Sequence, residues 1–332
     1  MADSITGGID SAATLSQTTK DILKNVITGI TGTGTVPSVV SVSGTSVVSG
    51  VDVNNNYQGV IVHSEAPVIG TVIIGTSNNS VILPAHVGLT SQGLAAPVTA
   101  DVANTYLLGL INAALPAAST NPDVIEQRQS LTTAVNQILN IIPSTTTSAV
   151  NVINVIDSTE VGSGPQNIVI NSNNTSDILA INMSAIRDGN TLVLGNVSSA
   201  VIVGSGTVQV GSGTTSAIVI GDSADQLIIG GTGSDTLVGG GGSDTLVGGT
   251  GANTFGFNAA GDYEVRGLGE GDLFHFNIPG VDNFTQLAAL VTGTTTVNGN
   301  TTYTFVGGST ITLVGITPEQ VTANLFNFGL SS

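Results

Sequence analysis

The sequence predicts a mainly β protein, built as a parallel β-roll or β-solenoid with a small helical N-terminal and inserted part. Residues 230–256 consist of three consecutive nine-residue units, GGTGSDTLV, GGGGSDTLV and GGTGANTFG. Short apolar triplets also recur at a spacing close to nine from Leu192 onward. Repetition at a fixed short period is typical of a solenoid, in which each unit adds one strand and one turn to a stack.

The N-terminal part combines a helical and a β pattern. Within segment 1–33, residues 12–28 place apolar side chains on one face, which predicts a helix. Within segment 34–95, apolar triplets are separated by Gly, Asn, Ser and Pro, which predicts short strands. The pattern leaves open whether this β-rich segment is a separate domain or the first coils of one long solenoid.

Segment 96–145 is expected to form a pair of helices. Residues 99–115 carry apolar side chains at helical spacing. The second helix is expected to begin after Asn121, with Pro122 at its first position, and to stop at Pro143. Its apolar stripe predicts packing against the protein core, and a contact between subunits is the alternative.

The solenoid is predicted to span residues 146–256, with a β-rich cap over residues 257–332. Strands are expected at 263–265, 273–276, 302–305 and 310–314, and short helices at 284–291 and 317–323. A solenoid needs such a cap because its last rung otherwise offers an unpaired edge to any neighbour.

The nonapeptides have a composition that suits calcium. Six glycine-rich residues form a tight turn whose carbonyls can point inward, the sixth residue supplies a side-chain oxygen, and the eighth is apolar and starts a strand. Calcium takes six to eight oxygen ligands in flexible geometry. The predicted ligand residues are Asp225, Gly231, Gly233, Asp235, Gly240, Gly242, Asp244, Gly249, Gly251 and Asn253.

Residues about eighteen apart are expected to stack on the same side of the roll, because each nonapeptide is half a coil. Asp235 should therefore face Asn253, and Asp225, from an imperfect unit that begins at Gly221, should face Asp244. This arrangement predicts about two to three calcium ions in two rows. A glycine-rich solenoid without metal is the alternative.

Composition narrows the function classes. The chain of 332 residues has a formal net charge of −17, only five Lys and Arg, and no cysteine. The missing cysteines exclude disulfide and thiol chemistry, and the missing basic residues disfavour nucleic acid as a partner. The sequence has no run of eighteen apolar residues, so no membrane span is expected. Its N-terminus lacks the pattern of a signal peptide, so secretion would need another route.

No enzyme is expected, because the residue constellations of the common hydrolases are missing. The three histidines, His63, His86 and His275, lie outside any H-E-x-x-H context. The sequence has no G-x-S-x-G nucleophile elbow, and the short Gly-Ser-Gly stretches fall in predicted solenoid turns.

Residues 230–256, followed by YEVRGLGEGDLFHF at 263–276, resemble the repeats-in-toxin (RTX) family of exported Gram-negative proteins. The resemblance covers about the last third of the chain. It implies bound Ca²⁺, an uncleaved type I secretion signal in the C-terminal region, and folding on contact with external calcium. The implied partners are the type I exporter, copies of the chain itself, and a cell-surface anchor such as lipopolysaccharide.

The favoured function is that of a secreted, calcium-dependent structural protein that assembles at the cell surface, as a surface-layer or filament subunit. The first alternative is a secreted adhesin or ligand-binding solenoid, for carbohydrate or ice, with a face formed by the threonines around Thr207 and Thr214–Thr215. The second is a secreted enzyme of a type that the sequence motifs do not reveal.

Overall fold

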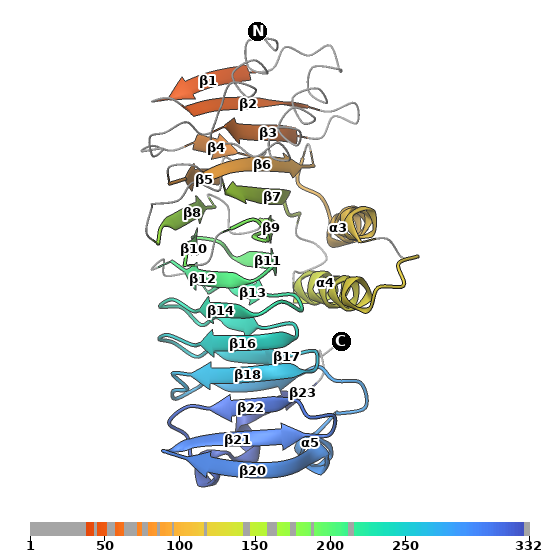
Figure 1. The fold of residues 1–332 in the computed structure, drawn as a ribbon, viewed down its shortest axis with the longest axis vertical. Coiled ribbons are helices and arrows are strands. Elements are labelled where there is room, and N and C mark those ends of the chain that lie inside the picture. The colour runs from red at the N-terminus through yellow and green to blue at the C-terminus, as the bar shows by residue number, and fades with distance from the viewer. Residues whose placement is uncertain are drawn as a thin grey trace.

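The protein is a stack of two long β-sheets, with a helical layer on one side (Figure 1). The computed structural model describes residues 38–42, 45–51, 57–62, 72–74, 79–84, 87–94, 96–115, 118–141, 147–157, 165–172, 177–186, 189–211 and 216–328. The predicted helix at 12–28 lies outside the described residues.

Sheet A has twelve strands among the described residues. In spatial order they are β1 (Ser38–Val42), β2 (Thr45–Val51), β3 (Tyr57–Val62), β6 (Val87–Gly93), β7 (Val150–Asp157), β9 (Ile178–Asn182), β11 (Ser199–Val203), β13 (Ile218–Ile220), β15 (Thr236–Val238), β17 (Thr254–Phe257), β19 (Leu273–Phe276) and β23 (Phe326–Phe328).

Sheet B has eleven strands among the described residues. In spatial order they are β20 (Val291–Val297), β21 (Asn300–Phe305), β22 (Thr310–Leu313), β18 (Gly261–Arg266), β16 (Gly242–Val247), β14 (Gln226–Ile229), β12 (Gly206–Val210), β10 (Thr191–Gly195), β8 (Asn167–Asn171), β5 (Asn79–Ile82) and β4 (Val72–Ile74).

The central part of both sheets is a parallel β-roll, as predicted. The chain alternates between the sheets, so that each strand pairs in parallel with the strand two positions along the chain, as β13, β15 and β17 do. In the repeats, Leu237 lies opposite Val219 and Phe255, eighteen residues away on either side. Two nine-residue units therefore make one coil, and the eighth residues of alternate units lie in one column of the core.

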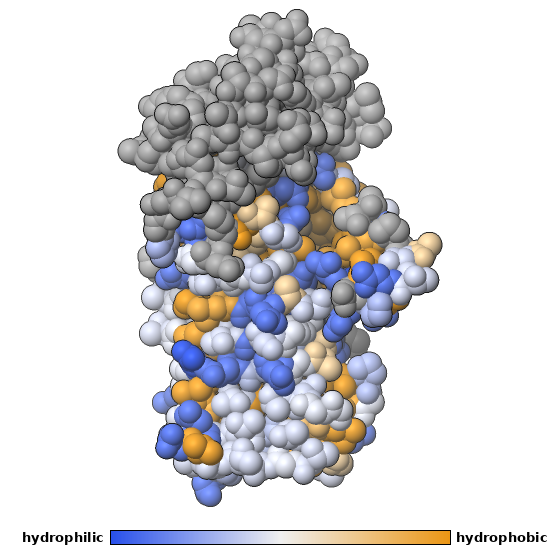
Figure 2. All heavy atoms as spheres, in the orientation of Figure 1, coloured by the Kyte–Doolittle hydropathy of each residue, from blue (hydrophilic) through white to orange (hydrophobic). Residues whose placement is uncertain are grey.

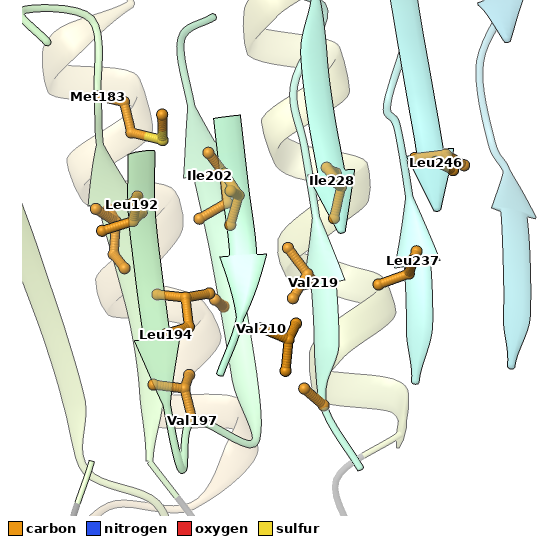
Figure 3. Packing of buried hydrophobic residues seen from close by; sticks show 14 of the residues in the cluster. Met183, Leu192, Leu194, Val197, Ile202, Val210, Val219, Ile228, Leu237 and Leu246 are labelled. Atoms are coloured by element: carbon orange, nitrogen blue, oxygen red, sulfur yellow. The ribbon is translucent and has the colours of Figure 1, made fainter. Parts of the chain in front are cut away.

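Apolar side chains from successive half-coils fill the space between the sheets. Figure 3 shows these side chains stacked in register along the roll, drawn from strands of both sheets. They are buried, and the labelled ones are Met183, Leu192, Leu194, Val197, Ile202, Val210, Val219, Ile228, Leu237 and Leu246. Burial of one such side chain stabilises the fold by roughly 1.5–3 kcal/mol.

Both ends of the stack change from parallel to antiparallel pairing. At the N-terminal end, β1, β2, β3, β6 and β7 pair antiparallel in sheet A, and β4, β5 and β8 do so in sheet B. The β strands of segment 34–95 therefore extend both sheets of the roll instead of forming a separate unit. At the other end, β20, β21 and β22 form an antiparallel meander.

The parallel pairing also continues past Gly256, where the sequence placed the end of the solenoid. Strands β18 and β22 extend sheet B, and β19 and β23 extend sheet A. This corrects the expected boundary at residue 256. The period lengthens there, since Phe255 pairs with Phe274 at nineteen residues, and the nonapeptide pattern no longer marks the coils.

Helices α3 (Ala100–Ala114) and α4 (Pro122–Ile141) cover the outer face of sheet A (Figure 1). Their buried side chains pack against outward-facing residues of β7, β9, β11, β13 and β15, which confirms core packing for the predicted stripe. The contact includes Leu107, Leu131 and Ile138 from the helices and Val201 and Ile220 from the sheet. No helix within the described residues is long and apolar enough to cross a bilayer.

Shorter helical elements lie in the C-terminal part. The helix predicted at 284–291 is present as α5 (Phe284–Leu290), and its N-cap Asn283 accepts a hydrogen bond from the Gln286 backbone N–H at 3.0 Å. The helix predicted at 317–323 is wrong. Two 3₁₀ turns, η1 (Pro318–Gln320) and η2 (Ala323–Leu325), replace it, because Val321 and Thr322 between them are extended.

Candidate metal centre

Six-residue turns carry the predicted metal ligands and form two rows along the roll. Turns 221–226 and 239–244 lead from sheet A to sheet B and are called here the first row. Turns 230–235, 248–253 and 267–272 lead from sheet B to sheet A and are called the second row. Within a row, each turn lies directly against the one about eighteen residues later, as the sequence predicted.

Close contact between successive turns requires glycine. Gly240 has φ 98°, and a Cβ there would lie 2.3 Å from the carbonyl oxygen of Gly221. Gly251 has φ 104°, and its Cβ would lie 2.3 Å from the carbonyl oxygen of Gly233. Such positions exclude any side chain, so the backbone carbonyls of one turn face the next turn at short range.

The remaining predicted glycines lie in the same stacked turns. Gly249 lies against the carbonyl oxygen of Gly231, and Gly242 against that of Ser223. The six glycines of the predicted ligand set thus lie in two turn-to-turn contacts, one in each row. Gly240 and Gly242 belong to the first row, and Gly231, Gly233, Gly249 and Gly251 belong to the second. Backbone carbonyls of this kind are hard oxygen donors suited to calcium.

The side chain at the sixth position of each turn is buried and joins one turn to the previous one. The backbone N–H of Gln226 donates to Asp244 Oδ1 at 2.8 Å, and that of Ala217 donates to Asp235 Oδ1 at 2.8 Å. The Asp235 N–H donates to Asn253 Oδ1 at 3.0 Å, which confirms that these two residues face each other. These carboxylate and amide oxygens therefore form a ladder along each row.

The two rows differ in how the second carboxylate oxygen is satisfied. In the second row, Asp235 Oδ2 accepts a hydrogen bond from the Gly231 N–H at 2.9 Å. In the first row, Asp244 Oδ2 is buried and has no hydrogen-bond partner, and the same is true of the nearby Gln226 Oε1. Buried polar atoms are rarely left unpaired, and two unpaired oxygens in one pair of turns are suited to hold a cation.

Asp244 Oδ2, Gln226 Oε1 and the carbonyl oxygen of Gly239 lie at the contact between turns 221–226 and 239–244. A Cβ at Gly239 would lie 2.2 Å from Asp244 Oδ2, and a Cβ at Gly221 would lie 2.2 Å from Gln226 Oε1 and 2.3 Å from the Gly239 carbonyl oxygen. The residues present fit calcium, with Asp244, Gln226 and turn carbonyls as the oxygens that would hold it. In the described part of the chain, no three acidic or histidine side chains gather as a metal cluster.

Electrostatics at Asp244 also favour a cation. The pKa of Asp244 is raised from 3.8 to about 8, mainly by burial; the hydrogen bond from Gln226 lowers it, and the negative charges of Asp225 and Asp222 also raise it. No basic residue occurs between Arg187 and Arg266 to balance these charges. The ionised carboxylate is therefore costly until a cation binds.

We expect acid to stabilise the calcium-free roll. The folded pKa of Asp244, about 8, exceeds its unfolded value, so the folded form holds this proton more tightly. The stabilisation is complete below about pH 4 and is lost as pH rises to about 8. The free energy of unfolding, measured with urea in EGTA, should therefore be higher at pH 5 than at pH 8. The Asp244→Asn variant, which keeps the acceptor for Gln226 but cannot titrate, should lose most of this difference; an unchanged difference would contradict the assignment.

The prediction that Asp225 faces Asp244 is wrong by one residue. The register pairs Leu227 with Thr245 and Ile228 with Leu246, so Gln226 occupies the sixth position of its turn. Asp225 is exposed instead, and it accepts a hydrogen bond from the Ser243 N–H at 2.7 Å. The sequence misled because Asp was assumed to hold the sixth position, whereas a buried amide holds it here.

Sequence reasoning missed two further buried carboxylates in the rows. Asp272 ends the turn G-L-G-E-G-D and accepts hydrogen bonds from the N–H groups of Asn253 at 2.6 Å and Gly269 at 2.7 Å. The final Asp of that turn was a usable signal. Asp222 accepts from the Gly204 N–H at 3.1 Å and from Gln127 of α4 at 3.1 Å. Nothing in the repeat pattern pointed to this contact between a turn and the helical layer.

His275, the histidine within the described residues, lies outside the turns of this centre. His275 lies in β19, where burial lowers its pKa. The positions of His63 and His86 lie outside the described residues, as do the threonines Thr214 and Thr215. The candidate metal centre therefore consists of turn carbonyls, two amide side chains and aspartates.

Comparison with known proteins agrees with this geometry. Residues 220–255 match the family model of the RTX calcium-binding nonapeptide repeat, in four copies. No curated protein matches the sequence. The four copies include the imperfect unit that begins at Gly221, whose sixth residue is Gln226. The chain therefore carries RTX nonapeptide repeats, and repeats of this type bind Ca²⁺.

Proposed function

We propose that this chain is a secreted structural subunit that calcium folds and that then assembles with copies of itself at the cell surface. RTX repeats are typical of proteins exported by type I systems, which supports secretion through such an exporter. In this proposal, an anchor such as lipopolysaccharide holds the assembled subunits at the cell surface. Calcium modules outside cells bind at about 10⁻⁴ to 10⁻³ M, so the repeats would be empty inside the cell and filled outside.

The observation that carries this proposal is the uncharged, open C-terminal end of the roll. Residues 283–318 contain no charged side chain, in a chain whose formal net charge is −17. Strand β20 is the terminal strand of sheet B, so within the described part of the chain only one of its two edges pairs with another strand. The surface in that region is largely pale in Figure 2, neither strongly hydrophilic nor strongly hydrophobic. Two copies can meet there without the repulsion that operates elsewhere on the molecule.

The edge strand also lacks most of the features that prevent association. Natural edge strands are commonly protected by charged residues, proline or bulges. Strand β20 has a bulge between Val291 and Gly293 but neither proline nor charge in its sequence VTGTTTV. Val297 at its end is 65% exposed, and Val306, after the following strand β21, is 64% exposed. These properties favour pairing with a second copy.

The ligand-binding alternative is less well supported by the described threonines. The outward row of sheet B through Thr207 contains Thr191, Leu227, Thr245 and Glu264 in successive strands. Leucine and glutamate interrupt the row, so it does not present the regular array of hydroxyl groups that a flat binding face needs.

The enzyme alternative is also less well supported. A cavity of 240 Å³ beside α4 is lined by polar groups of Gln137, Thr236, Thr254, His275 and Asn277. This lining offers hydrogen bonds but contains neither a carboxylate nor a serine or cysteine nucleophile. A lone histidine without a partner that orients it does not make an acid–base pair.

Negative-stain electron microscopy of purified protein tests the proposal. We expect dispersed particles in EGTA and ordered sheets or filaments after addition of millimolar calcium. Circular dichroism on the same samples reports folding separately from assembly. Folded but dispersed particles in calcium, up to the highest soluble concentration, would overturn the structural function and favour a monomeric binding module.

A further inference from the structure

An apolar cavity of 310 Å³ lies inside the C-terminal end of the roll. Its walls come from both sheets and from α5. Aromatic rings dominate the lining, with Phe257, Phe274 and Phe276 from β17 and β19, Tyr303 and Phe305 from β21, and Phe326 from β23.

The cavity exists because the two sheets end differently. Sheet A stops at the three-residue strand β23, whereas sheet B continues through β22 and β21 to β20. Helix α5 contributes Phe284, Leu287 and Ala288 to the lining, and Val321, between the two 3₁₀ turns, contributes one more side chain. Phe257 and Phe276 stack with ring centroids 4.8 Å apart, and Phe274 and Phe326 lie 5.5 Å apart. These rings give the cavity a preformed aromatic wall.

The cavity is accessible from the surface along α5. Phe284, which is 36% exposed, and the exposed Ala288 both contribute to its lining, so they form its entrance. Figure 2 shows an apolar patch at the lower right of the molecule, where Figure 1 places α5. A second cavity of 260 Å³ shares the wall residues Phe257, Phe276, Phe305 and Ile311 with the first. Two adjacent cavities with mainly apolar walls therefore lie at this end of the roll.

Tyr303 is the one residue with a polar side-chain group among those that line the first cavity. Burial raises the pKa of Tyr303, and the negative charge of Glu319 raises it further, so the group is a neutral hydroxyl at physiological pH. No basic residue lines either cavity. A ligand here gains one hydrogen bond and an apolar environment, and a negatively charged ligand gains no counter-charge.

We propose that this cavity binds an uncharged, elongated apolar molecule with one hydrogen-bonding end, of the long-chain alcohol class. Small-molecule sites typically have volumes of about 300–1,000 Å³, apolar walls and few polar groups, and this cavity has all three properties. An empty apolar cavity of about 150 Å³ in another protein holds benzene, so one twice that size holds a longer molecule. The site is separate from the calcium turns and does not depend on assembly.

Fluorescence of N-phenyl-1-naphthylamine, an uncharged apolar probe, tests the site on the full chain in millimolar calcium, at concentrations below assembly. We expect saturable enhancement of the probe's fluorescence, and displacement by 1-decanol. Decanoate at pH 8 should displace the probe at least about tenfold less well, because its buried carboxylate would lack a counter-charge. Equal displacement by decanol and decanoate would overturn the ligand class.

Two matched variants locate the site. Ala288→Trp should fill the entrance and weaken probe binding about tenfold or more, whereas Ala289→Trp, at an exposed neighbour outside the lining, should leave it unchanged. Tyr303→Phe should weaken decanol binding about fivefold while probe binding persists, because it removes only the hydroxyl. Circular dichroism confirms that each variant is folded. Equal binding by both tryptophan variants would overturn the assignment of the cavity as the site.

Discussion

Replacement of Asp235 and Asp244 together by alanine is expected to abolish the stabilisation of the roll by calcium. Each residue is the sixth of its turn, is buried, and links its turn to the previous one through a backbone hydrogen bond. The double variant removes one carboxylate from each row. In wild type, urea unfolding monitored by circular dichroism should shift to higher urea as calcium rises from micromolar to 10 mM, and in the double variant it should not.

The expected effect is large relative to the stability of a domain. A ligand at 100 times its dissociation constant stabilises the folded state by about 2.7 kcal/mol, and two such sites would contribute about 5 kcal/mol. Domains are typically stable by about 5–15 kcal/mol. Loss of both sites therefore leaves the folded repeats only marginally stable, even in millimolar calcium. A normal calcium response in the double variant would show that the metal binds elsewhere.

Two single variants separate the roles of charge and position. Asp244→Asn should lose calcium response in the first row but gain stability in EGTA at pH 8, because it removes a buried charge with a raised pKa. Asp225→Ala should keep most of the response, because Asp225 is exposed at the fifth position of its turn. If Asp225→Ala instead lost more of the calcium response than Asp244→Asn, Asp225 would be the ligand, and the register of the first row would be contradicted.

Introduction of two lysines on the outer face of β20 is expected to block assembly without affecting calcium-induced folding. Thr295 and Val297 are exposed and lie on the same side of this edge strand. In Thr295→Lys with Val297→Lys, two approaching copies would place like charges against each other and lose the apolar contact of Val297. The concentration of protein needed for sheets or filaments in 10 mM calcium should rise at least about tenfold.

The matched control carries the same pair of substitutions on α3. Thr105 is exposed and Val102 is 48% exposed there, so Thr105→Lys with Val102→Lys changes net charge equally, away from the edge. This control should assemble like wild type. If both variants assemble normally, β20 is not the contact; if both fail, net charge alone controls assembly. Either result would overturn the role proposed for the C-terminal end.

The repeat sequence was enough to predict the roll and its calcium turns, and the helical spacing of apolar residues in segment 96–145 was enough to predict the helical pair. A unit such as GGTGSDTLV contains its own turn, ligand and core residue, so local sequence fixes the local structure. The pairing of Asp235 with Asn253 followed directly from the eighteen-residue coil. The alignment of Asp225 failed because the imperfect unit at Gly221 has a different residue at its sixth position, and only the neighbouring strand reveals the register.

The sequence by itself determined the period, the chemistry of the turns and the apolar faces of the helices, because these depend on residues close together in the chain. Only the tertiary structure decided which turn has unsatisfied oxygens, where the solenoid ends, and that an apolar cavity remains at its C-terminal end. Asp244 and Asp235 have the same local sequence, G-S-D-T-L-V, yet Asp244 Oδ2 lacks a partner that Asp235 Oδ2 has. That difference arises from contacts between turns about eighteen residues apart, and the cavity arises from the unequal ends of the two sheets. A local pattern records neither, because both depend on residues far apart in the chain.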